Sequence, residues 1–217
     1  MTVVVPTLNA AFHLPPTLRA LGPVRDLIVA DGGSADDTIA VATGLGARVV
    51  RAPRGRGPQI VAGIAAAAEG WLLILHADTR LAPGWRSVAF RHMAAGPARA
   101  ACFRFALDSD APQARRLEHA VAWRCRYLAL PYGDQGLLIH TDLLRRIGGV
   151  RPLPLMEDVD LIRRIGRHRL AVLPPAAITS AEKWRRDGWW WRSARNLICL
   201  GLWFLGVPPR WIARVYG

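Results

Sequence analysis

Short apolar runs alternate with helix-like stretches along the first hundred residues of the chain. The apolar runs predict four strands, at Thr2–Val5, Asp26–Ala30, Ala47–Arg51 and Trp71–Leu75. The stretches between them predict helices, at Thr17–Leu21 behind Pro15 and Pro16, from Ser34 to about Leu45, and at Gln59–Glu69. Strands that alternate with helices of this length indicate an α/β fold with a Rossmann-like, mostly parallel sheet flanked by helices.

The second half of the chain is less regular. It predicts strands at Ala100–Ala106, Leu137–His140 and Leu170–Leu173, and helices at Pro112–Leu128, from Asp142 and from Met156. No repeat or low-complexity linker interrupts it, so we expect one domain over residues 1–182. The tail at 183–217 has a different composition, with seven basic residues against one acidic residue and six of the nine tryptophans. We expect it to form an amphipathic helical segment.

Polar residues follow the expected strands at the points where each strand ends. Asn9 follows the first strand, Asp31 the second, the loop from Arg54 to Gly57 the third, and Asp78 the fourth. Ligands of parallel sheets bind beyond the carboxyl ends of the strands, so these residues converge on one crevice. Ser34 and Asp37 have the spacing of a capping box for the second helix, which leaves the Asp31 carboxylate free for a ligand.

Several common chemistries are excluded or disfavoured by the loops themselves. The loop after the first strand is Pro6-Thr-Leu-Asn9 and not GxGxxG, which disfavours a nicotinamide cofactor. The chain has neither the GxxxxGK[ST] sequence of P-loop enzymes nor a GxSxG nucleophile motif. What remains is an ordered series of carboxylates, with a glycine–arginine loop among them.

Charge and cysteine content change this interpretation little. The net charge of +13 is carried by arginine, with Lys183 as the one lysine, and permits an anionic partner without requiring one. Arginine and tryptophan gather beside an apolar run, not along a polar face, so we expect no nucleic acid partner. Three scattered cysteines fit reduced thiols in a cytosol. The start of the chain shows no signal sequence, and the longest apolar run, Leu197–Val207, is 11 residues, too short to span a bilayer.

The ordered motifs resemble those of the family-2 glycosyltransferases of the GT-A fold. They run from residue 3 to about 160 in the family's order. The matching segments are Val4–Asn9, Ile28–Thr38, Gly55–Gly57, Leu73–Asp78, Gly133–Gly136 and Glu157–Asp158. The resemblance implies a nucleotide-diphosphate sugar as donor and a divalent metal, Mn²⁺ or Mg²⁺, as cofactor. His76-Ala77-Asp78 stands where the family has DxD, so Asp78 matches and His76 does not. Imidazole favours Mn²⁺ over Mg²⁺.

The resemblance also assigns roles to individual residues. It implies that the metal is held by Asp78, with His76 as a second ligand or as a nucleotide contact, and that Asp158 is the catalytic base. Donor binding is implied for Pro6, Thr7, Asn9, Asp31, Arg54, Arg56, His76, Ala77 and Asp78, with Asp31 at the base of the nucleotide and the two arginines at the phosphates. Sugar or acceptor contacts are implied for Asp134, Gln135 and Glu157.

The tail bears on the acceptor. The tail resembles the region that carries QxxRW in processive relatives, but Glu182-Lys-Trp-Arg-Arg186 stands in its place and lacks the glutamine, so we expect transfer of a single sugar to a hydroxyl or carboxyl acceptor. A lipid-linked or otherwise apolar acceptor would follow if the tail lies on a membrane. Trp189–Trp191 with the neighbouring arginines fits a helix on the inner face of the cell membrane, or one that closes the core or a homodimer. We therefore expect a cytoplasmic or peripheral membrane protein. A sugar-phosphate nucleotidyltransferase and a non-catalytic nucleotide- or membrane-binding module remain as alternatives.

Overall fold

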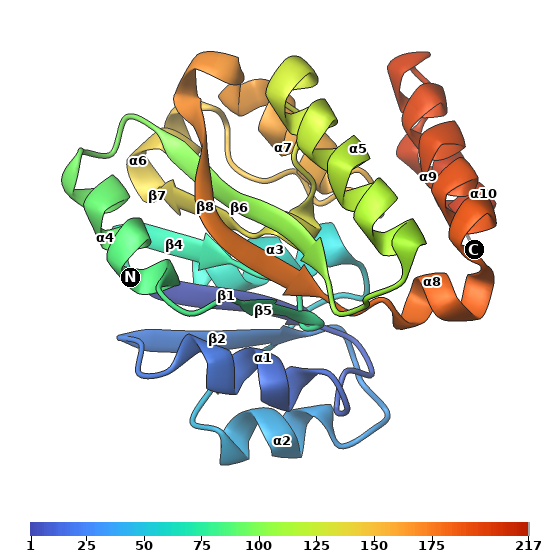
Figure 1. Ribbon diagram of the computed structural model, residues 1–217. Helices are drawn as coiled ribbons and strands as arrows, with labels where there is room; N and C mark the ends of the chain where they lie inside the picture. Colours follow the sequence, from blue (N-terminus) through green and yellow to red (C-terminus); the bar gives the residue numbers. More distant parts are fainter. Residues whose placement is uncertain (217) are drawn as a thin grey trace.

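The computed structural model describes residues 1–216 and has an eight-stranded sheet with helices on both faces (Figure 1). The strand order is β3-β2-β1-β4-β7-β6-β8-β5. The four strands predicted in the first hundred residues form its parallel part: β1 (Thr2–Thr7), β2 (Asp26–Asp31), β3 (Arg48–Arg51) and β4 (Trp71–Ile74). The chain moves outward from β1 to β3 and then returns to the other side of β1 with β4. The sheet therefore has its topological switch point between β1 and β4, the place where such sheets bind ligands.

The rest of the sheet is mixed. Its strands are β5 (Thr79–Leu81), β6 (Ala100–Leu107), β7 (Leu137–His140) and β8 (Leu170–Thr179). β7 runs antiparallel between β4 and β6, and β8 runs parallel to β6 and antiparallel to β5. β8 extends well beyond the predicted Leu170–Leu173, because a register shift between Phe103 and Arg104 of β6 takes up the two prolines that follow Leu173.

Helices cover the two faces of the sheet with separate apolar cores. On one face α1 (Leu14–Leu21) and α4 (Trp85–Ala94) pack against Val3, Val5 and Val29. On the other face α3 (Arg56–Ala65), α6 (Thr141–Arg146) and α7 (Glu157–Ile165) pack against Leu72 and Ile74. α2 (Thr38–Gly44) lies beyond α1, and α5 (Pro112–Leu128) packs along β6. The α/β architecture predicted from the sequence is confirmed.

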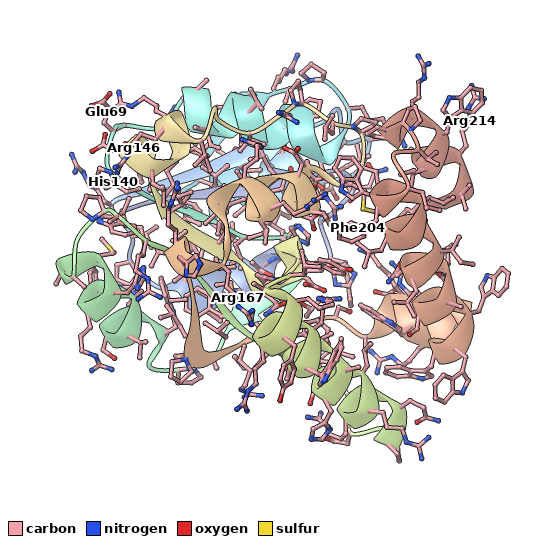
Figure 2. All side chains as sticks on the ribbon, turned by 90° about the horizontal axis from the view of Figure 1, so that it is seen from above. Glu69, His140, Arg146, Arg167, Phe204 and Arg214 are labelled. Atoms are coloured by element: carbon pink, nitrogen blue, oxygen red, sulfur yellow. The ribbon has the colours of Figure 1, made fainter. Side chains whose placement is uncertain are left out.

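The tail forms three helices that pack on the domain. They are α8 (Glu182–Asp187), α9 (Trp189–Phe204) and α10 (Pro209–Tyr216), and Figure 1 shows α9 and α10 side by side at one end of the molecule. Cys199 of α9 and Ile212 of α10 are fully buried against Leu155, Met156 and Val159. Phe204 and Arg214, labelled in Figure 2, mark this end, opposite Glu69 and His140. Within residues 1–216 we find no helix with the length and apolarity that crossing a membrane requires.

The predicted capping box is wrong, and the reason bears on the site. α2 begins at Thr38, and the Ser34 hydroxyl donates to Asp31 in place of capping the helix. Ser34 Oγ also accepts the backbone N–H of Asn9 at 2.9 Å. A serine three residues after an aspartate can bond back to it, and here that local bond wins over the cap.

Candidate active site

The turn after β2 is organised by a buried carboxylate. Asp31 is 1% exposed, and its two oxygens accept four hydrogen bonds, from the hydroxyls of Thr7 and Ser34 and the backbone N–H groups of Gly33 and Ser34. Burial alone would raise the pKa of Asp31, but these donors outweigh it and hold the pKa below its usual range. The structure thus places Asp31 at the predicted strand end, with its carboxylate engaged inside the turn.

The loop after β1 folds against the same turn. Asn9 adopts a left-handed conformation with a φ of 49°, and its side-chain oxygen accepts the backbone N–H of Ala35 at 2.9 Å. Pro6 and Thr7 are buried at the end of β1, whereas Arg54 is exposed in the loop after β3. Sequence reasoning missed Gln59, which is buried on α3 and donates its amide to the carbonyls of Thr7 and Ala30. It ties the ends of β1 and β2 together under this loop.

Arg56 lies in the first turn of α3 and not in a free loop, because the helix begins earlier than predicted. Its Nε donates to Oε1 of Glu157, which is 1% exposed at the start of α7. The charges of Glu157 and Asp158 raise the pKa of Arg56 even though burial opposes this. Gly57 lets the start of α3 pack closely against the backbone of Leu153, since a Cβ at position 57 would lie 2.7 Å from the Leu153 backbone nitrogen. Arg56, for which the resemblance implied phosphate binding, and Glu157, for which it implied a sugar or acceptor contact, therefore form one ion pair.

The His76-Ala77-Asp78 segment follows β4 at the switch point. Ala77 is held from behind, where its carbonyl accepts the Thr17 hydroxyl at 2.8 Å. Burial and the positive charge of Arg56 lower the pKa of His76 to about 4, so its imidazole is neutral at physiological pH. Burial would raise the pKa of Asp78, but Lys183 Nζ lies 2.9 Å from Asp78 Oδ2, and the pKa is lower than usual.

Two further carboxylates face the same cavity, which has a volume of about 120 Å³. Asp158 accepts the backbone N–H of Gly133 at 2.9 Å and that of Val159 at 2.8 Å. Burial opposes ionisation, but Arg56 and these N–H groups hold the pKa of Asp158 below its usual range. Burial raises the pKa of Asp134 to about 6, and the charges of Asp158 and Asp78 add to this rise. Two adjacent carboxyl groups thus have pKa values pushed in opposite directions.

Gly133 lets these groups meet. A Cβ there would lie 2.5 Å from Nε2 of His76 and 3.3 Å from a carboxylate oxygen of Asp158. Gln135 of the same Gly133–Gly136 segment points elsewhere: it is buried and donates to the Phe103 carbonyl at 2.8 Å. Of the two residues predicted to contact the sugar or acceptor in this segment, Asp134 lines the cavity, whereas Gln135 anchors the segment to β6.

The tail supplies one wall of this cavity. The lining residues that it contributes are Lys183, Trp184, Arg192, Asn196, Cys199 and Tyr216. Arg192 is 6% exposed and bonds to Oδ2 of Asp187 at 2.7 Å and to the Tyr216 hydroxyl at 3.2 Å. Only Lys183 and Trp184 lie in a segment that was compared with a family motif, Glu182–Arg186. For the other tail residues, the concentration of Trp and Arg in the tail was the only sequence feature that pointed to a role in the site. The tail is therefore part of the site and not only an appendage of the domain.

The donor set around His76 and Asp78 fits a divalent cation in part. A neutral imidazole and an ionised carboxylate are ligands that Mn²⁺ accepts. No group of three or more His, Cys, Asp or Glu side chains that could hold a metal by itself occurs among residues 1–216. A metal here would need further oxygen ligands from a bound molecule, such as a diphosphate.

Comparison with known proteins agrees with the motifs and the geometry. The model of glycosyl transferase family 2 matches residues 2–151, which is more than half of the chain. Uncharacterized glycosyltransferases of Mycobacterium bovis and Mycobacterium tuberculosis are 39% identical to it over 85 residues, which is 39% of this chain and 39% of each relative. The matched part thus spans well under half of those relatives.

Solved structures share the fold at low sequence identity. A mannosyltransferase from Pyrobaculum calidifontis, crystallised with GDP-Man and Mn²⁺, superimposes with a TM-score of 0.67 at 19% identity, over 91% of this chain and 60% of that one. Glucosyl-3-phosphoglycerate synthase from Mycobacterium tuberculosis, crystallised with Mn²⁺, UDP and phosphoglyceric acid, gives 0.61 at 20% identity, over 95% and 78%. The sheet and its helices are those of the GT-A fold. By its family match, its ordered motifs and its fold, the chain belongs to the family-2 glycosyltransferases.

Proposed function

We propose that this protein transfers a single sugar from a nucleotide-diphosphate sugar to an acceptor, with inversion at the sugar C1 and with a divalent metal, Mn²⁺ in preference to Mg²⁺. One observation carries the proposal: a single cavity at the switch point is lined by His76 and Asp78 and also by Asp134 and Asp158. The first pair suits a metal–diphosphate, and the second suits the acceptor and the reacting carbon.

The donor would lie across the ends of β1, β2 and β4. Pro6, Thr7 and Asn9 would border the nucleoside, and Asp31 would keep the turn beneath the base in shape through its four hydrogen bonds. Arg54 would reach the phosphates from its exposed loop.

The diphosphate end would be bound by cations that already line the cavity, Arg56 and Lys183. His76 and Asp78 would hold the metal, and Ala77 would keep them in place through its bond to Thr17. A bound metal would neutralise charge on the departing diphosphate. Glu157 is a positioning residue, because it orients Arg56 from beneath.

Asp158 would act as the base. In the transfer, an acceptor oxygen forms a bond to the sugar C1 while the bond from C1 to the diphosphate oxygen breaks, and the electron pair leaves with the diphosphate. The acceptor proton passes to a carboxylate that is ionised beforehand, and the lowered pKa of Asp158 keeps it ionised. The two N–H groups that it accepts fix its orientation. Asp134 would contact the sugar or acceptor from the other side.

Thermal unfolding with UDP-, GDP- and dTDP-sugars, with and without Mn²⁺, tests donor and metal together. We expect a Mn²⁺-dependent stabilisation by one donor, of about 2.7 kcal/mol at 100 times its Kd, that Asp78→Ala abolishes and the exposed-site control Asp110→Ala retains. Asp158→Asn should keep the shift but lose turnover of the donor. Turnover that survives in Asp158→Asn would refute the assigned base, and the absence of any shift would refute the donor assignment.

We also propose that the outer face of the tail contacts an anionic membrane. On α9 an uninterrupted apolar stripe faces outward, with Trp190 69%, Trp191 68% and Leu197 65% exposed. The neighbouring helices α8 and α10 carry exposed arginines, namely Arg185, Arg186, Arg210 and Arg214. Aromatic side chains favour the headgroup depth of a bilayer, and arginine favours its phosphates.

Flotation with phosphatidylglycerol vesicles tests this second proposal. We expect the protein to float with them and less with phosphatidylcholine vesicles, and we expect Trp190→Ser with Trp191→Ser to abolish flotation. Phe12→Ser is the control, because Phe12 is 84% exposed on another part of the surface. Equal flotation of both variants, or an apolar stripe that instead drives dimerisation in solution, would refute membrane contact.

A further inference from the structure

We propose that α9 and α10 complete an acceptor subsite for a neutral, hydroxyl-bearing molecule, and that Asn196 determines specificity for it over a carboxylate. The inference rests on the proposed function, which leaves the acceptor group open. Two observations support the inference. Some buried hydrogen-bonding atoms of the cavity have no partner in residues 1–216, and its cationic side chains already form ion pairs with carboxylates.

Two residues that line the cavity, one from the domain and one from the tail, each have an unpaired hydrogen-bond acceptor. On the domain side Asp134 Oδ1 is buried without a partner in residues 1–216, and on the tail side Asn196 Oδ1 is buried and equally unpaired within that range. Burying such an oxygen without a donor is costly, so each is expected to meet a donor when the site is filled. Hydroxyl groups supply such donors, whereas an ionised carboxylate supplies none.

A nearby donor is also free. The indole Nε1 of Trp184 lines the cavity and has no partner in the described chain. A hydroxyl can donate to one of these oxygens and at the same time accept from an N–H. A molecule with two hydroxyls would satisfy all three positions, which points to a diol or polyol head.

The charges of the cavity argue in the same direction. Its three cations are occupied, Arg56 by Glu157, Lys183 by Asp78 at 2.9 Å and Arg192 by Asp187 at 2.7 Å. Asp134 and Asp158 form no ion pair with any residue in the part of the chain that the structure describes. A carboxylate acceptor would therefore lie against two negative charges, and the cavity's cations already have carboxylate partners, with only Arg192 Nε among their nitrogens buried without a partner in residues 1–216.

The proton balance of the transfer agrees with this. A hydroxyl acceptor must lose its proton as its oxygen bonds to the sugar C1, and the cavity provides carboxylates to receive it. A carboxylate acceptor has no proton to lose, so it would not need a carboxylate base in the cavity. The neighbouring wall of Leu155, Met156 and Cys199 is apolar, so the body of the acceptor can be apolar behind its hydroxyl head.

The test compares matched alcohols and acids as acceptors. With the donor that stabilises the wild type, release of nucleoside diphosphate is measured with cyclohexane-1,2-diol and benzyl alcohol, and with cyclohexanecarboxylate and benzoate. We expect the alcohols to raise the release above hydrolysis by water, and the acids not to. Asn196→Leu should raise the KM for the diol at least tenfold with kcat changed less than threefold, and should leave the donor-induced shift in Tm unchanged.

Ser193→Ala is the matched control on the same helix, because the Ser193 hydroxyl donates to the Trp189 carbonyl at 2.8 Å and does not line the cavity. It should leave the KM for the diol unchanged. Stimulation by the acids, no stimulation by either alcohol, or an unchanged KM in Asn196→Leu would each overturn the inference. A wild type that no donor stabilises would instead refute the proposed function, so the two failures are distinguishable.

Discussion

Lys183 Nζ donates to Asp78 Oδ2 at 2.9 Å, joining the first helix of the tail to the loop after β4 across 105 residues of sequence. The ammonium group thereby occupies one oxygen of the carboxylate that we assign to the metal. A cation at this oxygen must share it with Lys183 or displace it. The tail thus influences the metal end of the cavity as well as the acceptor end.

Removing this amino group should strengthen metal binding. We expect Lys183→Met to lower the Kd for Mn²⁺ severalfold, because Asp78 then no longer pairs with an internal cation, and Lys183→Arg to stay close to the wild type. Isothermal titration of Mn²⁺ at saturating nucleoside diphosphate measures both, because saturation separates the effect on the metal from the loss of the Lys183 contact to the diphosphate. An unchanged Kd in Lys183→Met would show that the ammonium does not compete with the metal.

The ion pair between Arg56 and Glu157 should contribute to the stability of the fold. Arg56→Ala leaves Glu157 buried without its partner, which costs on the order of 3 kcal/mol for a pair of this burial. Burial raises the pKa of Glu157 despite Arg56, so the loss should grow as the pH rises and the unpaired carboxyl ionises. Urea unfolding at pH 5 and pH 8 measures it.

Arg54→Ala is the control for that measurement, since Arg54 is exposed two residues away. It should change the free energy of unfolding by less than about 0.5 kcal/mol. The double variant Arg56→Met with Glu157→Met should recover most of the loss, because no charge is left buried. Equal effects of Arg56→Ala and Arg54→Ala would contradict the role of the pair.

Gly57 should tolerate no side chain. A Cβ there would meet the backbone of Leu153, which cannot rotate away, so Gly57→Ala should destabilise the protein by about 1–3 kcal/mol and move Arg56. Gly44 is also in a helix, but nothing lies within 4 Å of a Cβ there, and Gly44→Ala should be neutral or stabilising by up to about 1 kcal/mol. Thermal unfolding of both variants compares them, and a neutral Gly57→Ala would refute the close packing.

The sequence predicted where several candidate residues lie in the fold, because position in a parallel sheet follows from topology. Asn9, Asp31 and Asp78 each lie at or shortly after the carboxyl end of a strand, and parallel strands bring such residues to one edge. It failed where local bonds compete: Ser34 matches a cap motif, yet its hydroxyl bonds to Asp31. It also failed for Asn196, whose part in the cavity depends on how α9 packs on α7. An amphipathic pattern shows that a helix has an apolar face without showing what that face covers.

The substitution Asp134→Asn should raise the stability of the protein and lower its transfer activity. The Asp134 pKa of about 6 in the folded protein lies above that of an unfolded aspartate, near 3.9. The folded state therefore binds this proton more tightly, so the contribution of Asp134 to stability is greatest at low pH and is lost as the pH rises through 6. By this difference Asp134→Asn should stabilise the protein at pH 7.5 by up to about 3 kcal/mol, and by about half as much at pH 5.

The same variant should lose transfer activity, because the ionised oxygen that faces the acceptor is replaced by an amide. Thermal unfolding at the two pH values and donor turnover with the diol acceptor measure the two effects. Asp110→Asn, an exposed aspartate outside the cavity, should change neither. A variant less stable than the wild type at pH 7.5 would mean that the Asp134 carboxylate is stabilised within the fold. A destabilising carboxylate retained in the cavity is instead what a functional site predicts, since residues selected for chemistry are often unfavourable for stability.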